Sequence, residues 1–258
     1  MPLTKENLIR RRFSKAAPRY GVMAQVQKGI AVALAERVKK VKGARVLDVG
    51  AGDGVLTKAL GQSGATVVSL DAAWGMVRLG KLQGKGCLWL QADACRLPFR
   101  KKSFDLLVSS SAYQWVNDLD AAFNEARRVL KPGGRLMVAM FGRATLCEFF
   151  ESLQCAAVSL KKPLPPIKRL ADKEEILRSL ASAALTEVEI GVEQREVTFT
   201  SVMALLVWLK GIGANSLSSR FFWGKGLMAA TENEYRARFM KNERLRASFE
   251  VIWIEAKV

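Results

Sequence analysis

The chain has 258 residues, and half of them are apolar, which suits one large α/β domain with a sizeable core. No apolar run approaches the ~18–20 residues that a membrane-spanning helix needs, and no apolar segment follows the basic N-terminus as in a secretory signal. We therefore expect a cytoplasmic protein without a membrane segment. Histidine is absent, and the four cysteines form no Cys-x-x-Cys pair, so the sequence predicts no metal site.

Positive charge is concentrated in two segments of the chain. The net charge is +17, and residues 1–45 hold 12 Lys and Arg against 2 Glu. Residues 207–246 hold 8 Lys and Arg against 3 Glu, whereas residues 46–206 come to only +3. Such clustering predicts an acidic macromolecular partner, either a protein or a nucleic acid. A generally basic surface without a specific partner is the alternative.

Apolar residues at helical spacing come first in the chain. Leu8, Ile9 and Phe13 predict a helix that Pro18 interrupts, and a second helix is expected over 22–40. Short apolar strands then alternate with helical segments, which predicts a Rossmann-like α/β fold, a parallel sheet with helices on both faces. The strands are expected at 44–49, 66–70, 87–91, 104–110 and 135–141, and the helices at 55–63, 74–82, 119–130 and 145–160.

Turn and cap signals divide the rest of the chain. LKPGG at 130–134 predicts a turn between a helix and a strand, because proline and glycine end helices. Asp172, with Glu175 three residues later, predicts a capped helix over 172–184. The remaining elements are expected as an edge strand at 186–199, helices at 201–213 and 227–241, and a closing strand at 247–256.

A glycine-rich turn, LDVGAGDG, joins the first strand to the helix that follows. Gly50, Gly52 and Gly54 allow the backbone to turn sharply and to approach a ligand without a Cβ collision. Strand, glycine turn and helix together form the nucleotide-binding unit of open α/β sheets. The spacing is Gly-x-Gly-x-Gly rather than Gly-x-Gly-x-x-Gly, and Asp48 and Asp53 would repel a phosphate, so a cationic or zwitterionic ligand is favoured.

Polar residues end the next three strands, at the sheet edge where such folds bind ligands. Asp71 is placed to accept both hydroxyls of a ribose, and Asp93 with the Ala94 backbone to contact an adenine ring. Ser109 and Ser110 end the fourth strand at the same edge. Each feature has a structural alternative, since the glycines can form a tight turn, Asp71 can cap a helix and Asp93 can serve a turn. Their order along the chain favours the ligand.

These motifs, in this order over roughly 44–141, resemble the class I S-adenosylmethionine-dependent methyltransferases. The resemblance rests on LDVGAGDG, Asp71, ADACRLPF, FDLLVSSSAYQW and EARRVLKPGGRL. It implies S-adenosylmethionine as cofactor and a seven-stranded, mostly parallel sheet with an antiparallel last strand. The cofactor-binding residues that it implies are Gln27, Asp48, Gly50, Ala51, Gly52, Gly54, Asp71, Ala72, Met76, Asp93, Ala94, Ser109, Ser110 and Gln114.

The flanks are similar to the malonyl-acyl-carrier-protein O-methyltransferases of biotin synthesis. This likeness covers nearly the whole chain and rests on FSKAAPRYGVMAQVQ (13–27), FGRATLCEF (141–149), LKGIGANS (209–216) and the segment from ENEYRARFM to ASFEVIW (232–253). It implies methyl transfer to the free carboxylate of malonyl-acyl-carrier protein, giving the methyl ester that primes pimeloyl synthesis. The chain departs from the family at Ser110, where Asn is usual, at Arg143-Ala144, where Pro-Gly is common, and in lacking a histidine near its C-terminus.

A carboxylate acceptor agrees with the composition, because a carboxyl group is already ionised at pH 7 and needs no general base. A chain without histidine can then act by positioning its substrate and excluding water. For the acceptor side, the candidates are Arg143, Lys210 and Arg220 as cations and Tyr20, Gln114 and Trp115 as walls and hydrogen-bonding groups. The alternative for Lys210 and Arg220 is a solvated surface.

We expect one methyltransferase domain with basic N-terminal helices at 1–43, a cofactor-binding core at 44–199, a helical lid at 200–246 and a closing strand at 247–258. An acidic acyl carrier protein bearing malonyl is the expected partner, docked on the basic helices and the lid. Alternatives are methylation of another small acid, a quinone ring or RNA, and a fold retained without catalysis. The tetrad typical of base amino-group methylation, Asn or Asp with Pro-Pro and an aromatic residue, is absent, which disfavours nucleic acid.

Overall fold

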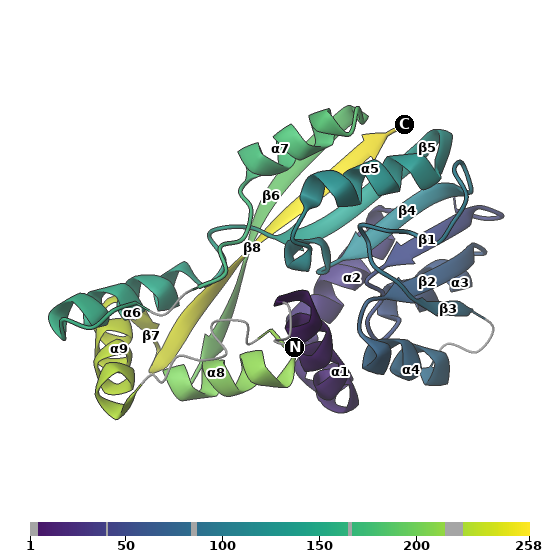
Figure 1. Cartoon of the computed structure of the whole chain (residues 1–258). Helices are drawn as coiled ribbons and strands as arrows, with labels where there is room; N and C mark the ends of the chain where they lie inside the picture. Colours follow the sequence, from purple (N-terminus) through teal and green to yellow (C-terminus); the bar gives the residue numbers. More distant parts are fainter. Residues whose placement is uncertain (1–4, 40, 84–86, 165–166, 215–223) are drawn as a thin grey trace.

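The computed structural model describes residues 5–39, 41–83, 87–164, 167–214 and 224–258 (Figure 1). Its strands are β1 (Arg45–Val49), β2 (Thr66–Asp71), β3 (Leu88–Gln91), β4 (Phe104–Ser110), β5 (Leu130–Phe141), β6 (Thr186–Phe199), β7 (Met240–Lys241) and β8 (Arg244–Lys257). Seven of them form one row in the order β3-β2-β1-β4-β5-β8-β6, and the short β7 pairs with β8. The Rossmann-like, mostly parallel fold predicted from the sequence is confirmed.

Strand direction changes only at the end of the row. The pairings from β3 through β5 are all parallel, whereas β8 runs antiparallel to both β5 and β6. The closing strand is therefore antiparallel as expected, and the strand at 186–199 lies at the sheet edge. β8 begins at Arg244, before the expected residue 247, because it forms a tight hairpin with β7. Asn242 and Glu243 both have positive φ, the backbone that two-residue hairpin turns require.

Helices cover both faces of the sheet. One layer of buried side chains joins Leu47 and Leu107 of the sheet to Phe123 and Ile176, and the other joins Val46 and Leu106 to Ile30, Leu34 and Leu60. Neighbouring strand residues thus alternate between the layers, as the pleat requires.

The helices are α1 (Lys5–Met23), α2 (Gln25–Arg37), α3 (Val55–Gln62), α4 (Trp74–Gln83), α5 (Leu119–Val129), α6 (Cys147–Ser159), α7 (Lys173–Ser182), α8 (Val202–Gly211) and α9 (Gly224–Phe239), with a 3₁₀ turn η1 (Tyr113–Trp115).

Strands β6 and β8 extend past the rest of the sheet. Pairing of β8 with β5 stops at Val251, but its pairing with β6 continues to Leu245. Helices α6, α8 and α9 gather around this extension (Figure 1). The buried carboxylate of Glu148, on α6, accepts hydrogen bonds from the backbone amide of Ser248 at 3.0 Å and from its hydroxyl. These bonds fix α6 to β8, and the buried side chains of the extension continue one layer of the core.

Pro18 does not interrupt the first helix, so this prediction is wrong. α1 continues through it to Met23, and the break falls at Ala24. Proline has no amide to donate to the carbonyl of Ser14, one turn earlier. Packing of α1 on α4 compensates, because Ser14 Oγ accepts a hydrogen bond from the Gly75 amide at 3.1 Å. Buried apolar residues of both helices surround this contact, among them Ala17 and Met76.

The LKPGG segment ends α5 at Val129, as predicted, and leads into β5. The register with β4 shifts across it, since Phe104 pairs with Leu130 and Leu106 with Arg135, and Gly133 has a positive φ of 72°. Gly133 donates to the Val258 carbonyl at 2.8 Å, and the Val258 amide donates to the Gly134 carbonyl at 3.0 Å. The end of the chain thus supplies hydrogen-bond partners for this irregular segment. Among the described residues, no helix is long and apolar enough to cross a membrane.

Replacing Gly75 by alanine is expected to lower the free energy of unfolding by ~1–3 kcal/mol, because the added Cβ would lie 2.5 Å from the Ser14 carbonyl oxygen. Denaturant unfolding followed by circular dichroism measures the change. Gly61→Ala on α3 is the matched control, since a Cβ there meets nothing within 4 Å and alanine favours helix. Equal stability of the two variants would contradict the close packing of α1 on α4.

Candidate active site

The glycine turn predicted to bind a ligand follows β1, at the carboxyl edge of the parallel strands. Gly50, Gly52 and Gly54 all have positive φ, of 72°, 57° and 86°. A Cβ on Gly50 would lie 2.2 Å from the Cβ of Ala112, in the segment after β4. Glycine is therefore required here both by the backbone conformation and by the close approach of two loops.

Asp71 holds the glycine turn from the end of β2. Its Oδ2 accepts a hydrogen bond from the Gly52 amide at 3.1 Å, and its Oδ1 accepts one from the Ala73 amide at 2.8 Å. Burial raises the pKa of Asp71 to about 6, although the two amides act in the opposite direction. Each carboxylate oxygen has a further lone pair, so the side chain can still accept a ligand hydroxyl.

Asp48 lies beneath the turn and is almost completely buried. Its Oδ2 accepts a hydrogen bond from the Thr57 hydroxyl at 2.7 Å, and its Oδ1 has no partner among the described residues. Burial raises the pKa of Asp48 to about 7, and the neighbouring carboxylates of Asp71 and Asp53 add to the increase. A buried acid with an unused oxygen favours a cationic ligand group beside it.

A hollow beside the turn extends from Asp48 towards α2. Gln27 and Ser110 line it, and both Gln27 Oε1 and Ser110 Oγ are buried without a partner among the described residues. Lys28 lines the same hollow, together with Ala51 of the turn. The oxygens of Gln27 and Ser110 can accept hydrogen bonds from an ammonium group, and Lys28 can pair with a carboxylate. Together these groups fit the zwitterionic end of an amino acid.

A larger cavity of about 890 Å³ continues from Asp71 to the loop after β3. Eight of the residues predicted to bind the cofactor line it: Gly50, Gly52, Asp71, Ala72, Met76, Asp93, Ala94 and Ser110. With the carboxylate of Asp71 at one end and the Asp93–Ala94 segment at the other, the cavity is arranged for a nucleoside.

Helix α1 covers this cavity with the predicted Tyr20 and with two residues that the sequence analysis did not assign to the site, Arg10 and Phe13. The Arg10 guanidinium forms an ion pair with Asp93 Oδ2 at 2.5 Å. The other oxygen of Asp93 accepts a hydrogen bond from the Cys95 amide at 2.9 Å. Helical periodicity identified the buried face of α1, but no local signal indicated what that face covers.

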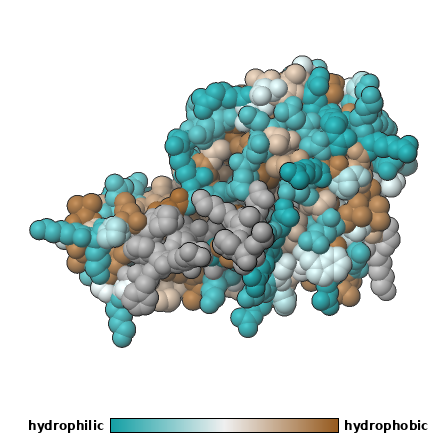
Figure 2. Space-filling model, in the orientation of Figure 1, coloured by the Kyte–Doolittle hydropathy of each residue, from teal (hydrophilic) through white to brown (hydrophobic). Residues whose placement is uncertain are grey.

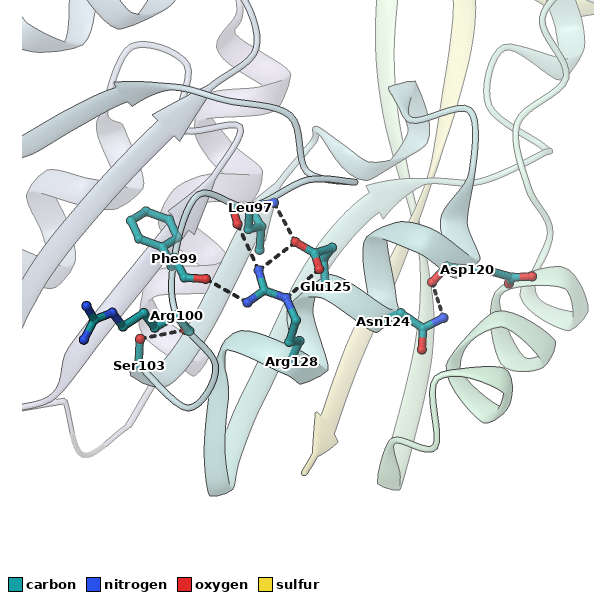
Figure 3. Close-up of polar contacts among 8 residues, drawn as sticks. All are labelled: Leu97, Phe99, Arg100, Ser103, Asp120, Asn124, Glu125 and Arg128. Carbon is teal, nitrogen blue, oxygen red and sulfur yellow. Dashed lines mark hydrogen bonds and ion pairs between the residues drawn. The ribbon is translucent and has the colours of Figure 1, made fainter.

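The loop that carries Asp93 is held in place by α5 (Figure 3). The Arg128 guanidinium donates to the carbonyls of Phe99 at 2.7 Å and Leu97 at 2.9 Å, and it pairs with Glu125. Glu125 in turn accepts from the Leu97 amide at 2.6 Å. The hydrogen bond from Arg128 lowers the pKa of Glu125, so the pair stays ionised and positions the loop from behind.

A second cavity, the acceptor cavity, lies next to the first and is open to solvent; its volume is about 1180 Å³. Four residues line both cavities and form a wall between them: Phe13, Tyr20, Ser111 and Trp115. The rings of Phe13 and Trp115 meet edge to face with centroids 5.5 Å apart. Ser111 has a positive φ of 57°, and its buried hydroxyl has no partner among the described residues.

Four of the residues predicted for the acceptor side line the acceptor cavity: Tyr20, Gln114, Trp115 and Arg143. Gln114 Nε2 donates to the Ser111 carbonyl at 2.8 Å, and its buried Oε1 has no partner among the described residues. Lys168 and Arg169, from the loop before α7, also line this cavity; the sequence analysis treated their segment only as a loop.

Other predicted residues lie elsewhere. The Ser109 hydroxyl donates to the Val49 carbonyl at 2.7 Å and lines neither cavity, so it joins β4 to β1 rather than facing a ligand. Lys210 is exposed on α8, outside the lining of both cavities. Arg220 lies outside the described residues.

Comparisons with known proteins agree with this geometry. A family model described as "Methyltransferase domain" matches residues 47–138. A malonyl-acyl-carrier-protein O-methyltransferase from Methylovorus sp. strain MP688 is 34% identical, with 95% of this chain and 86% of that protein covered. The chain belongs to the class I S-adenosylmethionine-dependent methyltransferases.

Further relatives extend the comparison. A protein of the same name from Geobacter sulfurreducens is 33% identical to this methyltransferase, with 95% of this chain and 96% of that protein covered. The crystal structure of YcgJ from Bacillus subtilis shares the fold, with a TM-score of 0.65 and 18% identity, covering 89% of this chain and 97% of that one.

The residues present fit S-adenosylmethionine, whose sulfonium supplies an electrophilic methyl group. The unpartnered oxygens of Gln27, Asp48 and Ser110 match the ammonium of its methionine part. Asp71 and the Asp93–Ala94 segment would hold its ribose and adenine. The absence of a Cβ at Gly50 lets the turn lie against Ala112, and both residues line the cavity.

Gly50→Ala is expected to weaken S-adenosylmethionine binding at least tenfold, because the new Cβ would meet Ala112 and displace the turn. Titration calorimetry measures the affinity. Gly133→Ala is the matched control, since Gly133 has the same φ of 72° and a Cβ there meets nothing within 4 Å. The double variant Gly50→Ala/Ala112→Gly removes the collision and should regain part of the affinity; no recovery would contradict the contact as the cause.

Asp48→Asn is expected to abolish cofactor binding and yet stabilise the ligand-free protein at pH 8. Burial raises the folded-state pKa of Asp48 above its unfolded value, so the ionised group destabilises the fold at high pH. The gain, ~1–3 kcal/mol above pH 7, should shrink as the pH falls through about 7 and vanish near pH 4, because Asp48 itself then becomes protonated.

Denaturant unfolding at pH 8 and at pH 5 measures this gain. Asp105→Asn is a control of opposite sign, because its hydrogen bond from Lys131 lowers the pKa of Asp105, and its loss should slightly destabilise the protein at pH 8. A destabilised Asp48→Asn protein at pH 8 would contradict the burial of an ionised carboxylate.

Proposed function

We propose that this methyltransferase esterifies a free carboxylate, namely the malonyl group of malonyl-acyl-carrier protein, and so serves biotin synthesis. The observation that carries the proposal is the charge of the acceptor cavity. Arg143, Lys168 and Arg169 line it, and none of the described residues in its lining is acidic. The two acids that pair with these arginines, Asp172 and Glu175, lie outside the lining. A lining that presents cations and no carboxylate favours an anionic acceptor.

The absence of a base in the same lining supports a carboxylate over other acceptors. Amines, phenols and carbon acids usually lose a proton when they are methylated, whereas a carboxylate is already ionised at neutral pH. Tyr20 is the titratable acid on the wall between the cavities, and burial raises the pKa of its hydroxyl, so it stays protonated at neutral pH and cannot accept a proton from the acceptor. Positioning and exclusion of water are then the main contributions of the protein.

Relatives support the substrate. The proteins from Methylovorus and Geobacter that match over nearly their whole length carry the name malonyl-acyl-carrier-protein O-methyltransferase. By this likeness the acceptor would be the malonyl group of an acyl carrier protein rather than a small acid or a quinone ring.

The position of the basic segments supports an acidic carrier protein as partner. Arg11, Lys15 and Arg19 are exposed at intervals of four residues along α1, and Lys210 is exposed on α8. α1 and α8 are in contact, with Trp208 Nε1 donating to the Met23 carbonyl at 2.8 Å. Hydrophilic side chains cover the outward face of α1 (Figure 2). We propose that carrier protein docks here and that α1 with the 200–246 segment acts as the lid.

Purified protein with labelled S-adenosylmethionine is expected to transfer label to malonyl-carrier protein, in a base-labile ester, and not to acetyl-carrier protein. Scintillation counting before and after mild alkali measures the ester. The kcat/KM should fall ~10-fold or more between low and high salt with carrier protein, and much less with malonyl-pantetheine, because only the protein substrate is steered by charge. Label entering RNA, or no label in malonyl-carrier protein, would contradict the proposed function.

A further inference from the structure

The wall between the two cavities restricts where an acceptor can react. Phe13, Tyr20, Ser111 and Trp115 belong to both linings, so a methyl group passes from one cavity to the other at this wall. The reacting oxygen of the acceptor must therefore lie beside it. A cation that orients the acceptor carboxylate has to be within reach of the same place.

Two of the three cations in the acceptor cavity are held by acids of α7. Arg143 Nη2 lies 2.5 Å from Asp172 Oδ2 and 2.9 Å from Glu175 Oε2, and Arg169 Nη2 lies 3.3 Å from Glu175 Oε1. Asp172 and Glu175 are also the two members of the capping box that begins α7. The two guanidinium charges are thus balanced by carboxylates, and both arginines serve to fix the start of the helix.

The third cation, Lys168, contacts the wall between the cavities. Its Nζ is 5.6 Å from the centroid of the Trp115 ring, in cation–π contact, and it donates to the Val116 carbonyl at 3.5 Å. The side chain is half-buried, and it lines the acceptor cavity. The contact with Trp115 therefore places the ammonium group against the wall at which transfer occurs.

We infer that Lys168 orients the carboxylate of the acceptor, an inference that rests on the proposed carboxyl methylation. An ammonium group is a point charge that can bind one carboxylate oxygen and leave the other free, whereas a guanidinium fork binds both. The free oxygen can then face the methyl group across the wall. Binding both oxygens would stabilise the ground state and slow the reaction.

The charge balance of the reaction agrees with this role. An oxygen of the bound carboxylate forms a bond to the methyl carbon while the sulfur–carbon bond breaks. The carboxylate and the sulfonium become a neutral ester and a neutral thioether, and no proton is transferred. Lys168 loses its ion pair with the acceptor at that moment, so the product is held less tightly than the substrate.

Lys168→Gln is expected to raise the KM for malonyl-carrier protein at least tenfold. The dissociation constant for S-adenosylmethionine, measured by calorimetry, should stay within twofold of wild type. Lys168→Arg should restore most of the KM but lower kcat, because the guanidinium holds both oxygens. A purely structural role would not separate KM from kcat in this way.

Two controls isolate the carboxylate contact. Lys81→Gln removes a similar cation–π contact, with Nζ 5.9 Å from the Trp74 ring on α4, away from both cavities, and should leave the kinetics unchanged. Acetyl-carrier protein, which lacks the carboxylate, is used as a competitive inhibitor. Its Ki should be the same for wild type and Lys168→Gln.

The measurements on wild type test the proposed function, and those on Lys168→Gln test the role of Lys168, so the two can be contradicted independently. If wild type methylates malonyl-carrier protein and Lys168→Gln has unchanged KM and kcat, the role of Lys168 is wrong while the proposed function stands. An equal rise in the KM for malonyl-carrier protein and the Ki for acetyl-carrier protein would also overturn it, because the cavity rather than the carboxylate contact would have changed. If wild type binds S-adenosylmethionine but methylates no malonyl thioester, the proposed function and this inference fall together.

Discussion

The contact between the glycine turn and the segment after β4 governs the rest of the site. Gly50 lies so close to Ala112 that a side chain would not fit between them. The Asp71 carboxylate fixes the turn by accepting a hydrogen bond from the Gly52 amide. With the turn held in this way, Oδ1 of Asp48 and the Ser110 hydroxyl remain without a partner among the described residues and can serve a ligand. Burial of the Asp48 carboxylate raises its pKa and lowers stability without the cofactor.

The two sides of the aromatic wall differ in their balance of charge. The cofactor side contains four carboxylates against the cations Arg10 and Lys28, whereas the acceptor side contains cations and no acid among its described lining residues. This separation suits a reaction in which a methyl group moves from a cationic donor to an anionic acceptor. The wall keeps the two charge sets apart while allowing one carbon atom to pass between neighbouring cavities.

The acceptor cavity is built from parts of the chain that are distant in sequence. α1 contributes Phe13 and Tyr20, the loop before α7 contributes Lys168, and α8 contributes Leu209. The long β6–β8 ladder makes this possible, because it carries α8 out beside α1. The same arrangement brings α8, with the exposed Lys210, into contact with the basic helix α1.

Local signals in the sequence determined the parallel core and the cofactor side. Apolar periodicity placed the strands, the glycine spacing identified the turn, and Asp71 stands where a strand of this kind ends. Local signals were insufficient where tertiary packing overrides a residue's own preference. Pro18, which disfavours a helix interior, remains helical because α1 packs on α4. They also misplaced Ser109, whose hydroxyl joins two strands. Only the tertiary structure brought Lys168 to Trp115, because hydrogen-bonding and burial patterns act over a few residues, whereas contacts between distant loops depend on how whole helices pack.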